Sequence, residues 1–565
     1  MDKKIKESVM KYGLHNAFKF NGKANAGAVI GKVLSEDPSV KDNINELKKE
    51  VDNTIKEISK LSAEEIRSRL EKIDPSLLEE KKHAPEKREL KELKGAANGK
   101  VVMRFAPSPS GPMHIGHAYV LSLNSEYCRK YNGKLILRIE DTNSENIDKD
   151  AYGMLPEDGK WITKDNISEV YIQSDRLGIY YDYAEKLIDM GKAYVCTCDN
   201  DEFKKLLTKS EPCDCRELAP KEHNLRFQKM FSEYKPGEAV MRIKTDLNNP
   251  NPAMRDWPAM RINDSKHPRK GDEFKVWPLM NFSVVIDDHE MGVTHAIRGK
   301  DHMDNEKRQR YVADYFGWKM PENLYVGRIN FEGMELSCSK TRLLIEEGKY
   351  SGWDDIQLPF LRAMKRRGYQ PDAFIKYSVD VGVTQTDKHV SAEEFFKALN
   401  FFNKEVIDEK SNRYFFMQRP KKINVENAPE QDVELDLHPN FSNRGKRTFK
   451  TKDKFYIEEE DYSKIKDGEL IRLMDCLNFV KKGKKIVFDS LDYANFKEKG
   501  KMIVHWLPED DFVKASVLMP DKTLIKGYAE KGIESLKEGD IVQFERFGFC
   551  RLDSKKKNEF WFGHK

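Results

Sequence analysis

The stretch 104–117, Arg-Phe-Ala-Pro-Ser-Pro-Ser-Gly-Pro-Met-His-Ile-Gly-His, constrains this chain more than any other segment. An apolar pair that can end a strand precedes it, and residues 118–123 follow with the apolar spacing of a helix packed on a sheet. Glycines let backbone approach a ligand, and a helix start offers unpaired N–H groups to an anion. The order of strand, tight loop and helix predicts a phosphate-binding turn. The residues of the turn that carry the chemistry are Gly111, Gly116, His114 and His117.

A second candidate lies downstream in 336–342, Leu-Ser-Cys-Ser-Lys-Thr-Arg. We expect a mobile, hydroxyl-rich loop that presents two cations, Lys340 and Arg342, as a triphosphate requires when its leaving group gains charge.

Length and composition indicate a soluble protein of several domains. The 565 residues are 39% hydrophobic and 34% charged, and the net charge is only +4, so any nucleic-acid surface must be a local patch. No apolar run has the length of a membrane span, and the first residues lack the apolar stretch of a signal peptide. We therefore expect a cytoplasmic protein without a membrane segment.

The eight cysteines do not suggest a disulfide scaffold, because the chain is long and has no secretion signal. Four of them form two Cys-x-Cys pairs, Cys196 with Cys198 and Cys213 with Cys215. A structural zinc ion held by four thiolates is one interpretation, and four reduced thiols in a surface loop are the other.

Hydrophobic periodicity divides the chain. Residues 1–98 show the spacing of amphipathic helices, with Ser62 and Glu65 as a candidate capping box, and 81–94 are charged enough for a solvated helix or linker. Apolar runs such as Leu135–Leu137 and Val284–Ile286 then alternate with helical segments, which predicts a parallel α/β sheet with a ligand at its carboxyl edge. The predicted domains are 1–98 (helical), 99–350 (Rossmann-like, with an insertion at about 192–275), 351–412 (helical) and 413–565 (two β-barrels).

The predicted β-rich tail interleaves lysines with aromatic residues. Such residues can neutralise phosphates and stack on unpaired bases, but barrel cores also need aromatic side chains. The aromatic residues in question are Tyr456, Phe488, Trp506, Phe544, Phe547 and Phe549.

Both motifs resemble signatures of the class I aminoacyl-tRNA synthetases, in the form used by the glutamyl and glutaminyl enzymes. The first resembles the HIGH signature. The second resembles the KMSKS loop in the divergent form of the archaeal and eukaryotic glutamyl branch, with Lys340 on the second lysine of that motif. Ser337 and Cys338 depart from the usual residues. The resemblance implies a multidomain α/β Rossmann-like core, a helical N-terminal extension and C-terminal all-β anticodon-binding barrels.

The resemblance also implies which residues form the site. It assigns catalysis to His114, His117 and Lys340, and ATP binding to the same three residues together with Pro107, Gly116 and Ser339. It assigns the amino-acid pocket to Arg104, Ser108, Glu140 and Arg298, in which Glu140 holds an ammonium and the arginines hold carboxylates. An arginine at 298 and Ala106-Pro-Ser-Pro109 favour glutamate over glutamine.

The implied activity is attachment of L-glutamate to tRNA(Glu), and possible attachment to tRNA(Gln), with ATP and Mg²⁺. The helical N-terminus is a candidate surface for a protein partner. Glutaminyl-tRNA synthetase, a non-catalytic tRNA-binding protein derived from a synthetase, and a small-molecule nucleotidyltransferase are the alternatives. Intact signature residues argue against the second, and the long β-rich tail argues against the third.

Overall fold

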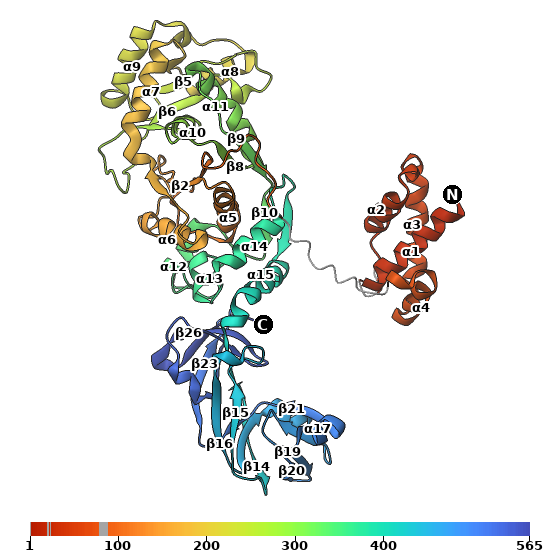
Figure 1. Cartoon of the computed structure of the whole chain (residues 1–565). Coiled ribbons are helices and arrows are strands. Elements are labelled where there is room, and N and C mark those ends of the chain that lie inside the picture. Colours follow the sequence, from red (N-terminus) through yellow and green to blue (C-terminus); the bar gives the residue numbers. More distant parts are fainter. Residues whose placement is uncertain (1, 20–21, 23, 78–88) are drawn as a thin grey trace. The chain divides into compact units, whose positions relative to one another are not determined.

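The computed structural model describes residues 2–19, 22, 24–77 and 89–565, which fall into two compact units, Met1–Lys87 and Arg88–Lys565 (Figure 1). Each unit is described by itself.

The N-terminal unit is built from helices, as predicted. Two small apolar cores hold it together, one around Val9, Val29 and Leu47 and the other around Leu14 and Ile66. The helices are α1 (Lys3–Lys19), α2 (Ala26–Glu36), α3 (Ile44–Ile58) and α4 (Ala63–Ile73), with 3₁₀ turns η1 (Pro38–Asn43) and η2 (Pro75–Leu77). The capping box is confirmed, because the Glu65 amide donates to Ser62 Oγ over 3.2 Å and the Ser62 amide donates to Glu65 Oε2 over 2.8 Å. Of the charged segment 81–94, residues 81–88 lie outside the described residues, and 89–94 form neither helix nor strand.

A five-stranded parallel sheet forms the centre of the larger unit, in the order β3-β2-β1-β8-β9. The chain leaves β1 toward β2 on one side and returns as β8 on the other, so the order reverses beside β1. Ligands of open α/β sheets bind at the carboxyl ends of the strands at this point. The strands are β1 (Val102–Phe105), β2 (Lys134–Ile139), β3 (Glu169–Ile172), β8 (His295–Gly299) and β9 (Glu322–Val326).

Helices cover this sheet. They are α5 (Ile115–Lys130), α6 (Ala151–Thr163), α10 (Met280–Glu290) and α11 (Met303–Phe316), with η3 (Gln173–Arg176) and η6 (Lys300–His302). One prediction is wrong here: Val284–Ile286 lie in α10 and not in a strand. A short apolar run that is buried all round has no distinguishing period, and packing decides its conformation.

Between β3 and β8 the chain builds a second, antiparallel sheet in the order β4-β5-β6-β7. This is the segment that the sequence analysis singled out as an insertion. Its elements are α7 (Leu177–Asp189), β4 (Ala193–Cys196), α8 (Asn200–Lys209), η4 (Asp214–Glu217), α9 (Pro220–Ser232), β5 (Val240–Ile243), η5 (Pro252–Met254), β6 (Pro258–Ile262) and β7 (Val276–Pro278).

Helices return after β9, around a two-stranded parallel pair of β10 with β11. The elements are β10 (Ile329–Glu332), α12 (Cys338–Glu346), α13 (Leu361–Arg366), α14 (Pro371–Val381), β11 (Lys388–Ser391), α15 (Ala392–Ile407) and η7 (Asp408–Lys410).

The remainder is rich in strands, as predicted, and forms two seven-stranded sheets and one hairpin. One sheet has the order β12-β25-β26-β27-β23-β24-β13, the other β21-β18-β19-β20-β14-β17-β22, and β15 pairs with β16. The strands are β12 (Asn412–Tyr414), β13 (Phe416–Met417), β14 (Pro420–Glu426), β15 (Gln431–Asp436), β16 (Lys446–Thr451), β17 (Lys454–Glu458), β18 (Leu470–Leu473), β19 (Asn478–Lys482), β20 (Lys485–Ser490), β21 (Gly500–Val504), β22 (Leu507–Pro508), β23 (Phe512–Leu518), β24 (Leu524–Glu530), β25 (Ile541–Phe544), β26 (Gly548–Ser554) and β27 (Glu559–His564). Short helices α16 (Glu459–Lys464), α17 (Tyr493–Lys499), η8 (Ser442–Arg444), η9 (Lys531–Ser535) and η10 (Lys555–Lys557) interrupt them.

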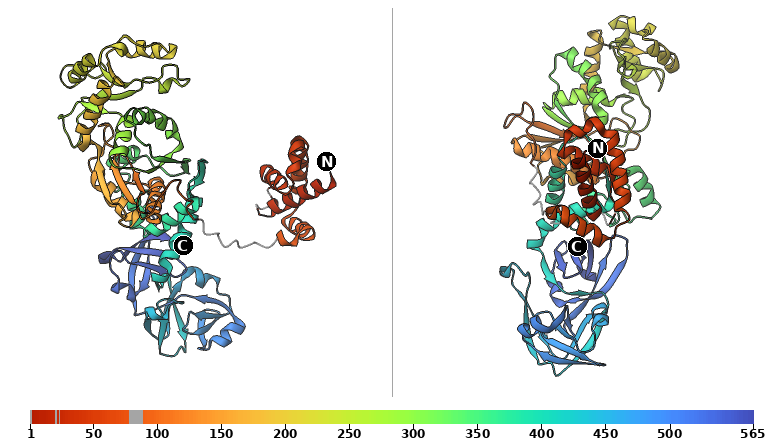
Figure 2. Two further views of the ribbon diagram at one scale, coloured as in Figure 1. Left: turned by 45° about the horizontal axis from the view of Figure 1, so that its top comes forward. Right: turned by 90° about the vertical axis from the view of Figure 1, so that its right-hand side faces the viewer.

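Within residues 89–565, the insertion lies at one end and the two seven-stranded sheets at the other, with the parallel sheet between them (Figures 1 and 2). In the described parts of the chain, no helix combines the length and the apolar character needed to cross a bilayer.

Candidate active site

Charged side chains converge at the carboxyl ends of three neighbouring strands. Arg104 lies near the end of β1, Arg138 near the end of β2 and Arg298 near the end of β8. Helix α10 carries Asp288 to the same place, where its carboxylate accepts from Arg138 Nη1 over 2.7 Å, Arg298 Nη2 over 3.1 Å and Arg104 Nε over 3.3 Å. All four side chains are buried. One carboxylate thus holds together three guanidinium groups that would otherwise repel one another.

The pKa of Asp288 reflects these contacts. Burial alone would raise it, but the three arginines together hold the pKa of Asp288 well below its usual range. Glu140, directly after β2, differs: burial raises its pKa although Arg138 and Arg104 lie close. Its side chain is 20% exposed and accepts from Arg138 Nη2 over 3.1 Å. Glu140 therefore keeps one side open to a ligand.

The first signature places two histidines at the start of α5. His114 is the N-cap residue, and its Nδ1 accepts from the amides of Gly116 over 3.1 Å and His117 over 3.4 Å. His117 Nδ1 in turn accepts from the His114 amide over 3.4 Å, and the two rings stack 3.7 Å apart. Burial lowers the pKa of both side chains, that of His117 to about 4. Each neutral ring must then carry its proton on Nε2, so both rings present a donor away from the helix backbone.

Neighbouring segments hold this loop in place. The Met113 amide donates to Asp158 Oδ2 over 2.9 Å, the Leu361 amide to the Met113 carbonyl over 2.9 Å and the Ile115 amide to the Pro359 carbonyl over 3.1 Å. The loop is therefore fixed from α6 and from the segment before α13. Pro107 is buried and its carbonyl accepts from the Glu140 amide, whereas Ser108 is exposed.

The second signature is not the loop that the sequence predicts. Ser337 is the N-cap residue of α12, and its Oγ accepts from the Lys340 amide over 3.4 Å, so Ser339 and Lys340 lie in the first helical turn. A serine side chain can replace the missing backbone partner at a helix start, which favours helix here. Lys340 is 71% exposed, with its ammonium 3.4 Å from Glu335. It is therefore free to reach a ligand.

The two signatures contact each other although more than two hundred positions separate them. Arg342 Nη2 donates to the Ser110 carbonyl over 2.5 Å, and the buried Cys338 thiol donates to the Pro112 carbonyl over 3.8 Å. A Cβ added to Gly111 would lie 3.1 Å from Cys338 Sγ. Glycine is needed at this position because the backbone passes so close to α12.

The cysteine pairs also meet. Cys196 Sγ lies 3.9 Å from Cys213 Sγ, and Cys198 Sγ lies 3.7 Å from Cys215 Sγ. The sulfurs of Cys196, Cys198 and Cys213 all lie within 4.8 Å of one another. Disulfide sulfurs are about 2.05 Å apart, so these are four free thiols in one cluster.

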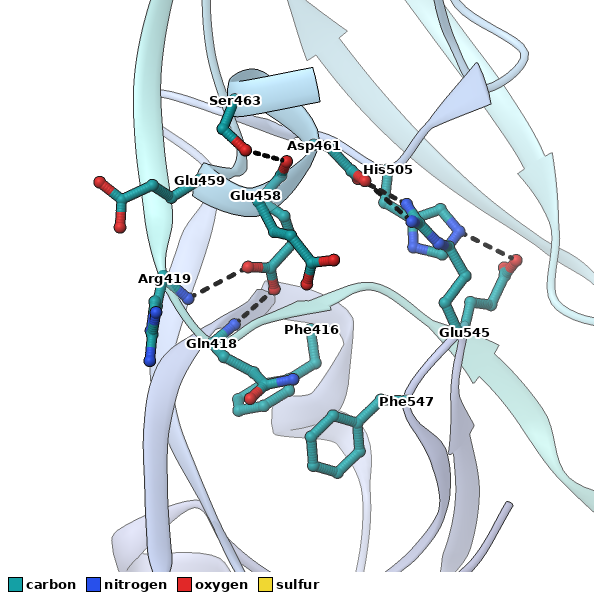
Figure 3. A pocket seen from close by; sticks show the side chains of 12 residues that line it. Phe416, Gln418, Arg419, Glu458, Glu459, Asp461, Ser463, His505, Glu545 and Phe547 are labelled. Atoms are coloured by element: carbon teal, nitrogen blue, oxygen red, sulfur yellow. Dashed lines mark hydrogen bonds and ion pairs between the residues drawn. The ribbon is translucent and has the colours of Figure 1, made fainter. Parts of the chain in front are cut away.

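The strand-rich tail holds a cavity of about 540 Å³ between its two large sheets (Figure 3). Phe416 and Phe547 line one side, and the backbone amides of Gln418 and Arg419 donate to Glu458. Of the aromatic residues that the sequence offered for base stacking, Trp506, Phe544 and Phe549 are buried in the cores of the sheets and cannot reach a ligand.

Sequence reasoning missed three members of the cluster: Arg138, Asp288 and Gln309 on α11. A signal for the first two was present, because Arg138 stands inside the apolar run Leu135-Ile-Leu-Arg-Ile139 and Asp288 lies just after the apolar run Val284–Ile286. Buried charges of this kind need partners.

Comparisons with known proteins place this geometry in a class. Family models match residues 100–409 as "tRNA synthetases class I (E and Q), catalytic domain", and 411–496 and 503–553 as the anticodon binding domain of the same group. The chain belongs to the class I tRNA synthetases for glutamate and glutamine.

Its relatives share its full length. A protein of Methanothermobacter thermautotrophicus, named glutamate–tRNA ligase, is 42% identical over 99% of this chain and 100% of its own. A protein of the same name from Methanobrevibacter smithii is 42% identical over the same shares. Another from Thermococcus kodakarensis is 45% identical over 97% of both chains.

The lowered pKa of His117 predicts a pH dependence of stability. Between its usual pKa of 6.5 and about 4, the unfolded chain binds a proton that the folded chain does not. Stability from this group is therefore present above pH 6.5 and is lost as the pH falls to about 4, by about 3 kcal/mol in all and by about 2 kcal/mol at pH 5. His117→Asn should flatten the loss, as measured by chemical unfolding at pH 7, 6 and 5. Equal slopes for both proteins would contradict the assignment.

Proposed function

We propose that this chain is a glutamate–tRNA ligase, which activates L-glutamate with ATP and transfers it to the 3′ end of tRNA(Glu). The observation that carries the proposal is the buried cluster of Arg104, Arg138 and Arg298 around Asp288, in which Arg104 belongs to the first signature. A substrate with two carboxylates needs guanidinium groups, and an amide side chain does not call for a buried arginine at 298.

In this pocket, Arg104 and Arg298 hold the two substrate carboxylates, with Arg298 nearest the side-chain end, and the open side of Glu140 holds the ammonium. Ser108, an exposed residue of the first signature, contacts the same substrate in this proposal. Support comes from the single unpartnered, buried donor on Arg298, its Nε, which lacks an acceptor among the described residues. A buried N–H of this kind is costly unless a ligand satisfies it.

Activation needs no general base, because the α-carboxylate that attacks the α-phosphorus of ATP is already ionised. The bond to the phosphorus forms as the bond to pyrophosphate breaks. Our scheme places the triphosphate at the start of α5, against Pro107 and Gly116, where His114 and His117 donate from Nε2. Ser339 and Lys340 contact the leaving pyrophosphate and stabilise the negative charge that develops on it. A Mg²⁺ ion carried by ATP would neutralise part of the phosphate charge. The terminal ribose hydroxyl of tRNA then attacks the carbonyl carbon of the glutamyl-adenylate, the ester bond forms as the bond to AMP breaks, and the hydroxyl proton leaves with the AMP phosphate.

The tail supplies the surface for the anticodon arm in this scheme. The cavity of Figure 3 has the volume for an unpaired base, and the partly buried Phe547 offers an aromatic face. tRNA(Gln) is a second candidate acceptor. Charging of tRNA for translation places the protein in the cytoplasm, and we assign the N-terminal helical unit to binding a protein partner.

We further propose that the cysteine cluster holds a structural Zn²⁺. Tetrahedral coordination with Zn–S bonds near 2.3 Å separates the sulfurs by about 3.8 Å. Two sulfur separations match this value, 3.9 Å between Cys196 and Cys213 and 3.7 Å between Cys198 and Cys215. The sulfurs of Cys196, Cys198 and Cys213 lie within 4.8 Å of one another, and Cys215 would move closer to them to complete the site. The ion would join the end of β4 to η4 and so stiffen the insertion.

A charging experiment tests the proposed activity. Transcripts of tRNA(Glu) and tRNA(Gln) are incubated separately with labelled glutamate and glutamine, ATP and Mg²⁺. We expect glutamate on tRNA(Glu), because the arginine cluster selects an anionic side chain. Glutamine on tRNA(Gln) alone would identify the glutaminyl rival, and no acylation at all would favour a non-catalytic tRNA-binding protein.

Two variants separate the nucleotide and amino-acid roles. Lys340→Ala should slow adenylate formation by roughly 10²- to 10³-fold and leave the KM for glutamate nearly unchanged. Arg298→Cys should raise the KM for glutamate far more than that for ATP. Pyrophosphate exchange is measured with tRNA present, and Lys349→Ala, an exposed lysine paired with Glu347, is the matched control. If Arg298→Cys impaired both substrates equally, Arg298 would have only a structural role.

Metal analysis tests the zinc proposal. Protein purified without added zinc should contain one Zn²⁺ per chain, and Cys198→Ser should lose it. Cys476→Ser, a buried cysteine in the tail, serves as control and should retain it. Chelation should speed hydrogen exchange in 196–217, because the ion holds that segment. A metal content unaffected by Cys198→Ser would exclude the cluster as the site.

A further inference from the structure

The guanidinium of Arg298 has one neutral partner, Gln309 on α11. Gln309 Oε1 accepts from Arg298 Nη1 over 2.7 Å, and Asp288 accepts from Nη2. Gln309 is 1% exposed. The carboxylate of Glu306, on the same helix, is engaged by Arg310 and Tyr325 instead. In the described part of the chain, Asp288 is therefore the only carboxylate within ion-pair distance of Arg298, and Arg104 and Arg138 share it.

The orientation of the Gln309 amide is dictated by chemistry. Arginine has no acceptor, so the oxygen of Gln309 must face Arg298 and its Nε2 must donate onward. It does so to Asn281 Oδ1 over 3.2 Å, and Asn281 Nδ2 donates to Asn305 Oδ1 over 3.2 Å. Asn305 Oδ1 also accepts from Arg308 Nη1 over 3.0 Å, so the oxygen of Asn305, like that of Gln309, faces an arginine. A row of neutral amides from α10 and α11 thus fixes Arg298.

The neutrality of this row has a consequence for substrate choice. A guanidinium needs acceptors on its edges to stay in one orientation, and a carboxylate would supply them but would also cancel its charge. An amide oxygen supplies the hydrogen bond alone. Arg298 is thereby held in place. Its charge remains available to an anionic ligand, because its one carboxylate partner, Asp288, is also bound by two other arginines.

We propose that Gln309 is a positioning residue that sets the preference for glutamate over glutamine, by orienting Arg298 without neutralising it. This inference rests on the role proposed above for Arg298. Gln309 does not touch substrate; it acts through the arginine.

The test is the nearly isosteric Gln309→Glu, compared with Gln309→Met, which keeps the side-chain length and loses both hydrogen bonds. Each is assayed for aminoacylation with glutamate and glutamine. Gln309→Glu should lower kcat/KM for glutamate by about 10- to 100-fold, mainly through KM, because a second carboxylate satisfies Arg298. Its kcat/KM for glutamine should change only a few-fold, and the KM for ATP should not change.

Gln309→Met should weaken glutamate use less, by roughly 10-fold, because Arg298 loses one contact and keeps its charge. Gln385→Glu, the same substitution at an exposed position in the loop before β11, should behave as the parent protein. Melting temperatures with and without ATP report whether each variant is folded. If Gln309→Glu unfolds, Gln309→Met decides between the two roles. Loss of the orientation of Arg298 should lower the ratio of kcat/KM for glutamate to kcat/KM for glutamine. A purely structural role should leave this ratio unchanged.

Arg298→Cys, measured alongside, separates the two levels of the proposal. If it leaves the glutamate preference intact, the proposed pocket is wrong. If it abolishes the preference while Gln309→Glu retains the parent ratio and KM, the pocket stands and the inference on Gln309 is overturned.

Discussion

The carboxylate of Asp288 is the interaction on which the site depends. It accepts from three buried guanidinium groups that arrive from β1, β2 and β8. Removing one partner of a buried ion pair leaves an uncompensated charge, which costs several kcal/mol. The strand order and the packing of α10 are therefore tied to this one side chain. An uncharged residue at 288 would leave Arg104 and Arg298 repelling each other in a buried place.

The charges around Asp288 do not cancel. Four guanidiniums, those of Arg104, Arg138, Arg176 and Arg298, face three carboxylates, those of Glu140, Asp287 and Asp288. The excess of one positive charge matches an amino acid with two carboxylates and one ammonium. In the proposed pocket, this charge balance would contribute to selection of the substrate. The neutral amide of Gln309 preserves that excess beside Arg298.

The nucleotide side is organised by contact between the two signatures. Arg342 reaches the Ser110 carbonyl, and Cys338 packs under Gly111. Lys340 therefore stands on a helix that is attached to the loop carrying His114 and His117. The departures from the usual second signature have a physical reason in this chain, because Ser337 caps α12 and Cys338 is small enough to fit beneath the glycine backbone.

The conformation of some segments could be predicted from the sequence, and that of others could not. The turn at 104–117, the helices of 2–77 and strands such as β17 and β20 follow local patterns of glycine, caps and alternation, which act over a few residues. The conformation of Val284–Ile286 could not be predicted, because a short buried apolar run has no distinguishing period. The helical conformation of Ser337–Lys340 was also missed, because the residues that favour a helix start also favour loops.

The sequence by itself determined the chemistry on offer: a phosphate-binding turn with two histidines, a lysine downstream, arginines and a glutamate near strand ends, and four paired cysteines. Only the tertiary structure decided that Arg138 and Asp288 belong with Arg104 and Arg298, that Gln309 orients one of them, and that the two signatures meet. Some of these contacts join segments more than two hundred residues apart, and only the tertiary fold, with its order of strands in the sheet, brings such segments together.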